Sequence, residues 1–204
     1  MSTIWRLVKF VVLFEIALYR SLLRWLVRRP HVPAGATAAP YVGALSLLLW
    51  TFVIVSAIET VALHLVLPWE SVRLVADIIG VWGLLWMLGF TASNHVYPHL
   101  IAPEGLRLRS GHSVDLTVPW DTVERVSTRE RSLERSKTLQ VDDDVLSLAV
   151  TSRTNVEVRL SRPLTVPLGR ETVEVTEIRF FADEPRPLVQ QAFQRLSARS
   201  GGSR

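Results

Sequence analysis

Two long, nearly uncharged runs constrain the fold of this chain more than any other feature. Residues 41–67 contain one Asp, Glu, Lys or Arg, and residues 72–96 contain two. A helix needs about 20 mostly apolar residues to cross a bilayer, so both runs are long enough. The link between them, residues 68–71, has room only for a tight turn. The sequence therefore predicts a transmembrane helical hairpin over residues 41–99.

Basic residues around the hairpin predict its orientation. The arginines nearest to it are Arg20, Arg24, Arg28 and Arg29 before it, Arg107 and Arg109 after it, and Arg73 beside the turn. Segments rich in Lys and Arg stay on the cytoplasmic side of a membrane. We therefore expect a multi-pass protein of the plasma membrane with both termini in the cytoplasm.

Residues 1–29 are predicted to form an amphipathic helix that lies in the membrane interface. The first forty residues carry six basic side chains against one acidic side chain. Most of these basic side chains fall within about 100° of one another on a helical wheel, opposite a wide apolar face. The candidate contacts with lipid headgroups are Arg20, Arg24, Arg28 and Arg29. A third membrane-spanning helix is the alternative. Residues 30–40 are predicted to be a linker.

Residues 100–199 are predicted to form a β-rich cytoplasmic domain, with a flexible tail over residues 200–204. The segments GLRLR and VDLTV alternate apolar and polar residues around a turn that contains glycine, a pattern typical of a β-hairpin. Further strand-like runs are Val123–Thr128, Val145–Thr151, Val156–Leu160, Leu164–Leu168 and Val173–Phe181. A long charged loop is expected between the first two of these runs.

An amphipathic helix is expected to close the domain. Asp183 is a candidate N-cap for it, and the apolar stripe that follows places Phe193 and Leu196 in the core. Seven short strands and one helix predict a bent sheet or barrel whose open end the helix covers. The predicted fold class is thus an α+β membrane protein.

The order of two spans, then EGLRLRSG, VPWDTVERV and IRFFADEP, resembles the membrane-anchored bacterial pleckstrin-homology-like (PH-like) proteins, and more narrowly an uncharacterised actinobacterial group. The resemblance covers roughly residues 41–199. It implies a PH-like fold in the cytoplasm and a role in binding or assembly, without a reaction. The loop between the first two strands is short here, and Arg107 and Arg109 share one strand face. We therefore expect a solvated strand face rather than an inositol-phosphate site.

Three polar residues within the predicted spans form the candidate intramembrane site. Glu59 and Asp77 lie at similar depths on the two helices, and His64 could join them from the outer end of the first helix. Ionisable groups at such depth are costly and serve by default as proton relays, cation sites or contacts with a partner. The alternative is structural: Asp77 pairs with Arg73 one turn earlier, and Glu59 is neutral within a helix bundle.

The sequence contains no motif that favours an enzyme, and no cofactor or metal site is predicted. There are no cysteines, Pro98 interrupts the spacing of His95 and His99, and the three aspartates of VDDDV match no calcium loop. The basic N-terminal segment favours a bilayer over nucleic acid as a partner. We expect a membrane-anchored scaffold or accessory subunit that binds another protein or a second copy of itself, with a lipid as a further ligand of the domain. A transport-linked protein that uses Glu59 and Asp77 is the alternative.

Overall fold

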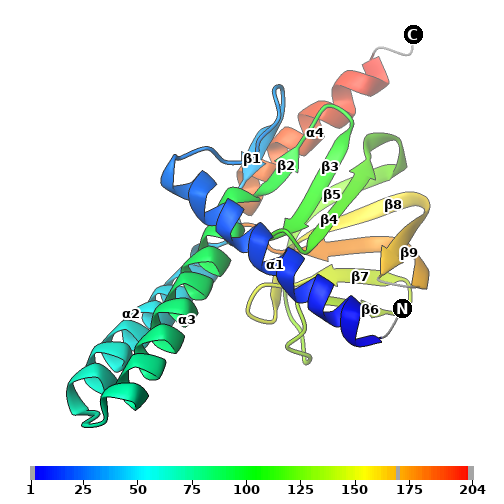
Figure 1. Ribbon diagram of the computed structural model, residues 1–204. Helices are drawn as coiled ribbons and strands as arrows, with labels where there is room; N and C mark the ends of the chain where they lie inside the picture. Colours follow the sequence, from blue (N-terminus) through cyan, green and yellow to red (C-terminus); the bar gives the residue numbers. More distant parts are fainter. Residues whose placement is uncertain (1–2, 169–170, 202–204) are drawn as a thin grey trace. The chain divides into compact units, whose positions relative to one another are not determined.

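The computed structural model describes residues 3–168 and 171–201. It has an α+β fold, with four α-helices and two β-sheets in these residues. The chain divides into two compact units, one formed by residues 1–30 and 46–96 and the other by residues 31–45 and 97–204 (Figure 1). We describe each unit by itself.

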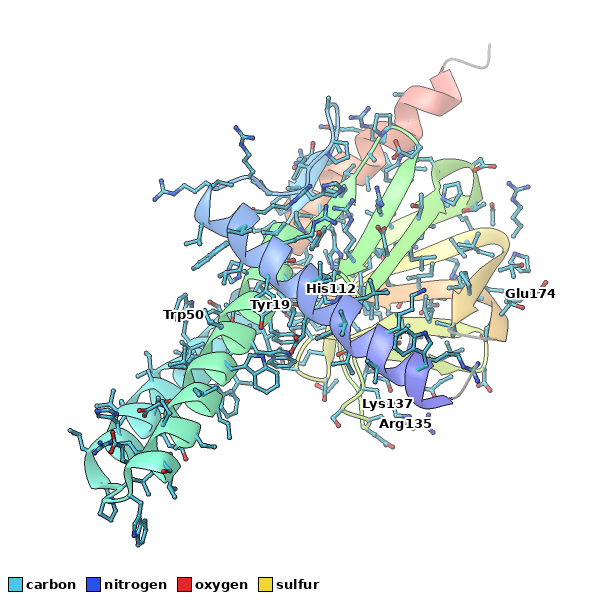
Figure 2. All side chains as sticks on the ribbon, viewed as in Figure 1. Tyr19, Trp50, His112, Arg135, Lys137 and Glu174 are labelled. Atoms are coloured by element: carbon cyan, nitrogen blue, oxygen red, sulfur yellow. The ribbon has the colours of Figure 1, made fainter. Side chains whose placement is uncertain are left out.

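The first unit is helical and contains two helices that could cross a membrane. Its helices are α1 (Thr3–Leu26), α2 (Gly43–Val66) and α3 (Glu70–Val96). In the described part of the chain, α2 and α3 are the helices that are long and apolar enough for a span. Most of their apolar side chains are exposed, and Figure 2 shows them projecting outwards along both helices. Because so large an apolar surface is unfavourable in water, it supports an association with a membrane.

Helix α1 packs on the C-terminal half of α3. Leu18 and Ser21 of α1 are fully buried, as is Ala92 of α3. A Cβ atom built on Gly89 would lie 3.1 Å from Leu18 Cβ, so the absent side chain lets the helices approach closely. In Figure 1, α1 crosses α3 instead of running alongside it.

The second unit contains two sheets that pack around one apolar core. The first sheet has the order β1 (Thr37–Ala39), β2 (His99–Ile101), β3 (Gly105–Ser110) and β4 (Val114–Pro119). The second has the order β5 (Val123–Ser132), β8 (Arg153–Leu168), β9 (Glu171–Phe180), β7 (Val145–Leu148) and β6 (Leu139–Asp142). All pairs are antiparallel except β7 with β9. A 3₁₀ turn (Trp120–Thr122) joins the sheets, and α4 (Pro185–Gly201) packs against the same core.

The helical hairpin is an insertion between two paired strands. β1 precedes α2 and β2 follows α3, yet Thr37 pairs with Ile101 and Ala39 pairs with His99. The two ends of the α2–α3 hairpin therefore emerge from neighbouring strands of one sheet.

The prediction of a single bent sheet or barrel is wrong, because the two sheets stay separate. β4 and β6 are outer strands of their sheets, and no ladder joins them among the described residues. The predicted β3–β4 hairpin and the strands at β5, β7 and β9 are present. The runs Val156–Leu160 and Leu164–Leu168 belong to one strand, β8, whose register against β9 shifts between Arg159 and Leu164.

Three strands were not predicted from the sequence. β1 lies in the expected linker, β2 follows directly on the second span, and β6 lies in the expected charged loop. They are three or four residues long and have weak alternation. Such short strands are stabilised by their partners in the sheet, not by local preference.

The expectation that Phe193 lies in the core is also wrong. Phe193 is 68% exposed, whereas Leu188 and Ala192 of the same helix are buried and Leu196 is partly buried against the core. Residues 188, 192 and 196 repeat at four-residue spacing and share one face. Phe193 is one position further along the helix, about 100° away.

Substitutions on α4 should separate these two positions. Leu188→Ala should lower the free energy of unfolding by about 2–5 kcal/mol, because it leaves a cavity in the core. Phe193→Ala should change it by at most about 0.5 kcal/mol. Pulse proteolysis of the detergent-solubilised chain at increasing urea concentrations measures both. Equal destabilisation by the two substitutions would contradict this assignment of the buried face.

Candidate functional site

The α2–α3 hairpin brings its small residues together at one level. A Cβ atom built on Gly80 would lie 2.6 Å from the Thr60 side chain, so only glycine fits there without a shift. One to two turns away, the Ser56 hydroxyl lies 3.5 Å from the Met87 sulfur. These contacts fix the pairing of the two helices and thus the neighbours of each polar residue.

His64 and Asp77 form a pair within this hairpin. His64 Nδ1 lies 2.8 Å from Asp77 Oδ2, so two of the three predicted site residues are in contact. A role for this pair as a proton relay or a cation site stays a prediction. The alternative pairing of Asp77 with Arg73 is wrong, since the ion pair in the described residues is to His64. The other oxygen, Asp77 Oδ1, is buried without a hydrogen-bond partner. It remains an acceptor for a further donor.

Glu59 lies apart from that pair, on the wall of a groove along the hairpin. The groove has a volume of about 610 Å³, and Gly80, Gly83 and Trp86 of α3 also line it. A Cβ atom built on Gly83 would meet nothing within 4 Å, so space is open there. Glu59 is exposed and makes no hydrogen bond or ion pair among the described residues.

The four candidate headgroup contacts lie at the C-terminal end of α1. Arg20 and Arg24 belong to the helix, and Arg28 and Arg29 follow its last residue. Arg28 has a positive φ of 52°, and its N–H donates to the Trp25 carbonyl, which ends the helix. Arg20, Arg28 and Arg29 are exposed, and Arg24 is half-buried. A lipid contact at these residues stays a prediction.

A buried polar cluster in the β unit was missed by the sequence reading. Arg109 was expected on a solvated strand face, but its side chain is only 1% exposed. Its Nη1 donates to the His31 carbonyl at 2.8 Å, and its Nε lies 3.8 Å from Asp115 Oδ1. Nε and Nη2 have no hydrogen-bond partner. The expectation failed because residues 31–40, which were predicted to belong to a linker, are part of this unit.

His99 is the centre of this cluster. Its Nδ1 accepts the Arg109 backbone N–H at 3.0 Å, so Nε2 carries the proton and donates to the Phe181 carbonyl at 3.0 Å. Its ring stacks on Tyr41 with 4.6 Å between centroids. Burial lowers the pKa of His99 to about 4 and raises the pKa of Tyr41 to about 12, so both are neutral at pH 7. His99 lies in β2 and not on α3, so it does not share the helical spacing of His95, in agreement with the break predicted at Pro98.

Asp183 caps a helix other than the one expected. Its carboxylate accepts the Gly43 N–H, at 2.9 Å from each oxygen, at the start of α2, and its own N–H donates to the Pro40 carbonyl at 2.8 Å. A carboxylate at a helix N-terminus stabilises the unpaired N–H groups of the first turn. Asp183 therefore holds the first residue of α2, the first predicted span.

Comparisons with known proteins identify no relative: no protein family, curated protein or solved structure matches this chain. The described residues contain no cluster of three or more His, Cys, Asp or Glu side chains that could hold a metal. Inferences about function therefore rest on the geometry of the two units.

The buried His99 should make the stability of the chain depend on pH. Its pKa is about 4 in the folded state and about 6.5 when unfolded, so the unfolded chain binds the additional proton between these values. The stability that it contributes is complete above pH 6.5 and falls as the pH drops towards 4, by an amount on the order of 3 kcal/mol. Urea unfolding of the solubilised chain at pH 4.5 to 7 measures this slope. His99→Gln should reduce the slope, and an unchanged slope would contradict the assignment.

Proposed function

We propose that this protein is a membrane-anchored scaffold or accessory subunit. In this proposal α2 and α3 cross the plasma membrane, α1 lies in the cytoplasmic interface, and the β unit is a PH-like domain in the cytoplasm that binds other proteins. The exposed apolar surface of α2 and α3 supports the anchor. Two sheets with a C-terminal helix packed against their core support the PH-like assignment.

The pairing of β1 with β2 supports the proposed topology. Ala39 and His99 are paired residues of one sheet, and the whole hairpin lies between them in the sequence. Both ends of the hairpin must therefore lie on the same side of the membrane. The arginine-rich segment before the hairpin assigns that side to the cytoplasm.

The groove beside Glu59 supports the proposal that the hairpin binds a partner. An unpaired carboxyl group that faces lipid is unfavourable, and a groove with glycines on its floor leaves space for a second backbone. A helix with a small residue and a hydrogen-bond donor, such as Ser, Thr or Asn, would fill the groove and satisfy Glu59. The partner is thus a membrane protein or a second copy of this chain.

A transport-linked function is the second candidate, and one observation favours it. The His64–Asp77 pair could exchange a proton, and Asp77 Oδ1 is free to accept a second donor. In that case Glu59 and Asp77 must be able to carry charge. The scaffold requires only the shape and hydrogen bonding of these side chains.

Single cysteines test the topology, because the chain has no cysteine of its own. A membrane-impermeant thiol reagent should label Glu70→Cys in intact cells and should label Ser200→Cys only after lysis. Labelling of the cysteine at position 200 in intact cells would contradict the proposed orientation. Labelling of both sites after lysis is the control for reactivity.

Substitutions in the groove separate the two candidate functions. Gly83→Leu fills the groove and should remove the partner that co-purifies in mild detergent, whereas Ala62→Leu, on the exposed surface outside the groove, should not. Glu59→Gln should keep the partner, because the amide retains size and hydrogen bonding.

The cellular phenotype of a gene deletion supplies the second readout. Under the scaffold proposal, a chain with both Glu59→Gln and Asp77→Asn complements the deletion, and Gly83→Leu does not. The opposite pattern, at equal membrane abundance, would establish that the charges are needed and would favour transport.

A further inference from the structure

β5 is an outer strand of the five-stranded sheet, and one of its edges has no ladder in the described part of the chain. Such an edge presents backbone N–H and C=O groups that can pair with an added strand. The register of β5 against β8 is regular over residues 125–128 and shifts on both sides of this run. An added strand can therefore form a regular ladder along residues 125–128.

Two arginines lie opposite each other on the outer face of this sheet. Arg125 of β5 is paired with Arg159 of β8, whereas the next pair, Val126 with Val158, packs with the core on the other face. Like charges directly opposite each other in a sheet are destabilising. Both arginines are exposed, and neither forms an ion pair within residues 3–168 and 171–201. A carboxylate from outside the chain would relieve their repulsion.

The carboxylates nearest to this pair are engaged by other arginines. Glu177 lies opposite Arg159 in the register, but its ion pair is with Arg179. Glu157, two residues before Arg159 on the same face of β8, forms ion pairs with two other arginines of β5. The outer face beside β5 thus has a local excess of positive charge, which complements an acidic partner.

A groove with a volume of about 740 Å³ lies between β5 and α4. Val126 of β5 and Phe193 and Leu196 of α4 contribute apolar surface to its lining, and Phe193 is 68% exposed. Asp121 and Glu124 also line the groove, so a further carboxylate is unfavourable there. The groove therefore suits an apolar side chain.

We propose that the free edge of β5 binds an extended segment of a partner protein in which acidic and apolar residues alternate. The segment pairs with residues 125–128, and its successive side chains point to opposite faces of the sheet. An acidic residue lies beside Arg125 and Arg159, and the apolar residue next to it enters the groove near Phe193. This inference rests on the proposed function, in which the β unit binds other proteins.

An anionic bilayer is another occupant that the arginines alone could attract. A bilayer surface would neutralise their charge, but it would leave the backbone groups of β5 and the groove without a partner. An extended acidic segment uses the charge, the strand edge and the groove together, so the observations favour the segment.

Peptide binding to the full chain in phosphatidylcholine nanodiscs tests the proposal. The probe is a short fluorescent peptide of alternating Glu and Val, and fluorescence anisotropy measures its dissociation constant. The same peptide with Lys in place of Glu should bind at least about tenfold more weakly, because it repels the arginines. Two further peptides are N-methylated, one at the Glu amides and the other at the Val amides. One of these two should bind at least about tenfold more weakly, because it loses the ladder with β5.

Matched variants locate the binding. Arg125→Gln should weaken binding of the Glu–Val peptide about threefold, and Phe193→Ala should weaken it about fivefold. Lys137→Gln is the control, because it removes the same charge from an exposed residue in the segment before β6 (Figure 2). It should leave the dissociation constant unchanged.

Four results would overturn the proposal. The first is absence of binding by the Glu–Val peptide, and the second is full affinity in both Arg125→Gln and Phe193→Ala. The third is equal binding by both N-methylated peptides and the parent peptide, which would indicate a purely electrostatic surface such as a bilayer requires. The fourth is self-association of the chain that the peptide reverses, which would make a second copy the occupant. Cysteine labelling and the partner of the hairpin groove test the proposed function separately, so the two failures are distinguishable.

Discussion

The pairing of β1 with β2 is the constraint on which the rest of this structure depends. Because the helical hairpin is inserted between these two short strands, their pairing holds both ends of the hairpin at one edge of the β unit. Asp183 adds a second restraint through the first N–H of α2, and Asn155 exchanges two hydrogen bonds with Ala182 beside it. A fragment that begins at residue 100 would lack β1 and the contact between Asp183 and Gly43.

Burial of the Arg109 side chain in the β unit has an energetic cost. Burial and the nearby Arg107 lower the pKa of the Arg109 guanidinium, and two of its nitrogens have no hydrogen-bond partner. Its bond to the His31 carbonyl and its backbone bond to His99 join the segment after α1 to the segment after α3. The energetic cost of burying a charge is offset only where such contacts are well satisfied. The cluster therefore links the two segments through which the chain enters the β unit.

The proposed binding site on the hairpin arises where the packing of the chain is incomplete. On the hairpin, open space beside Gly83 leaves room for another helix near an unpaired Glu59. In the β unit, a cleft lined by aliphatic and polar side chains lies between β4 and β6, which no ladder joins among the described residues. The groove on the hairpin suits a helix with a hydrogen-bond donor.

The sequence by itself determined the elements whose signal is local. The nearly uncharged length of α2 and α3 predicts candidate spans, and the alternation in β3 and β4 predicts a hairpin, because both signals depend on neighbouring residues. The tertiary structure alone decided the pairs between distant residues. It joined β1 to β2 across the hairpin, buried Arg109, paired His64 with Asp77 and turned Phe193 to the surface. It also kept the two sheets apart. These features depend on which segments meet, and a contact between residues 37 and 101 leaves no periodic trace in a single sequence.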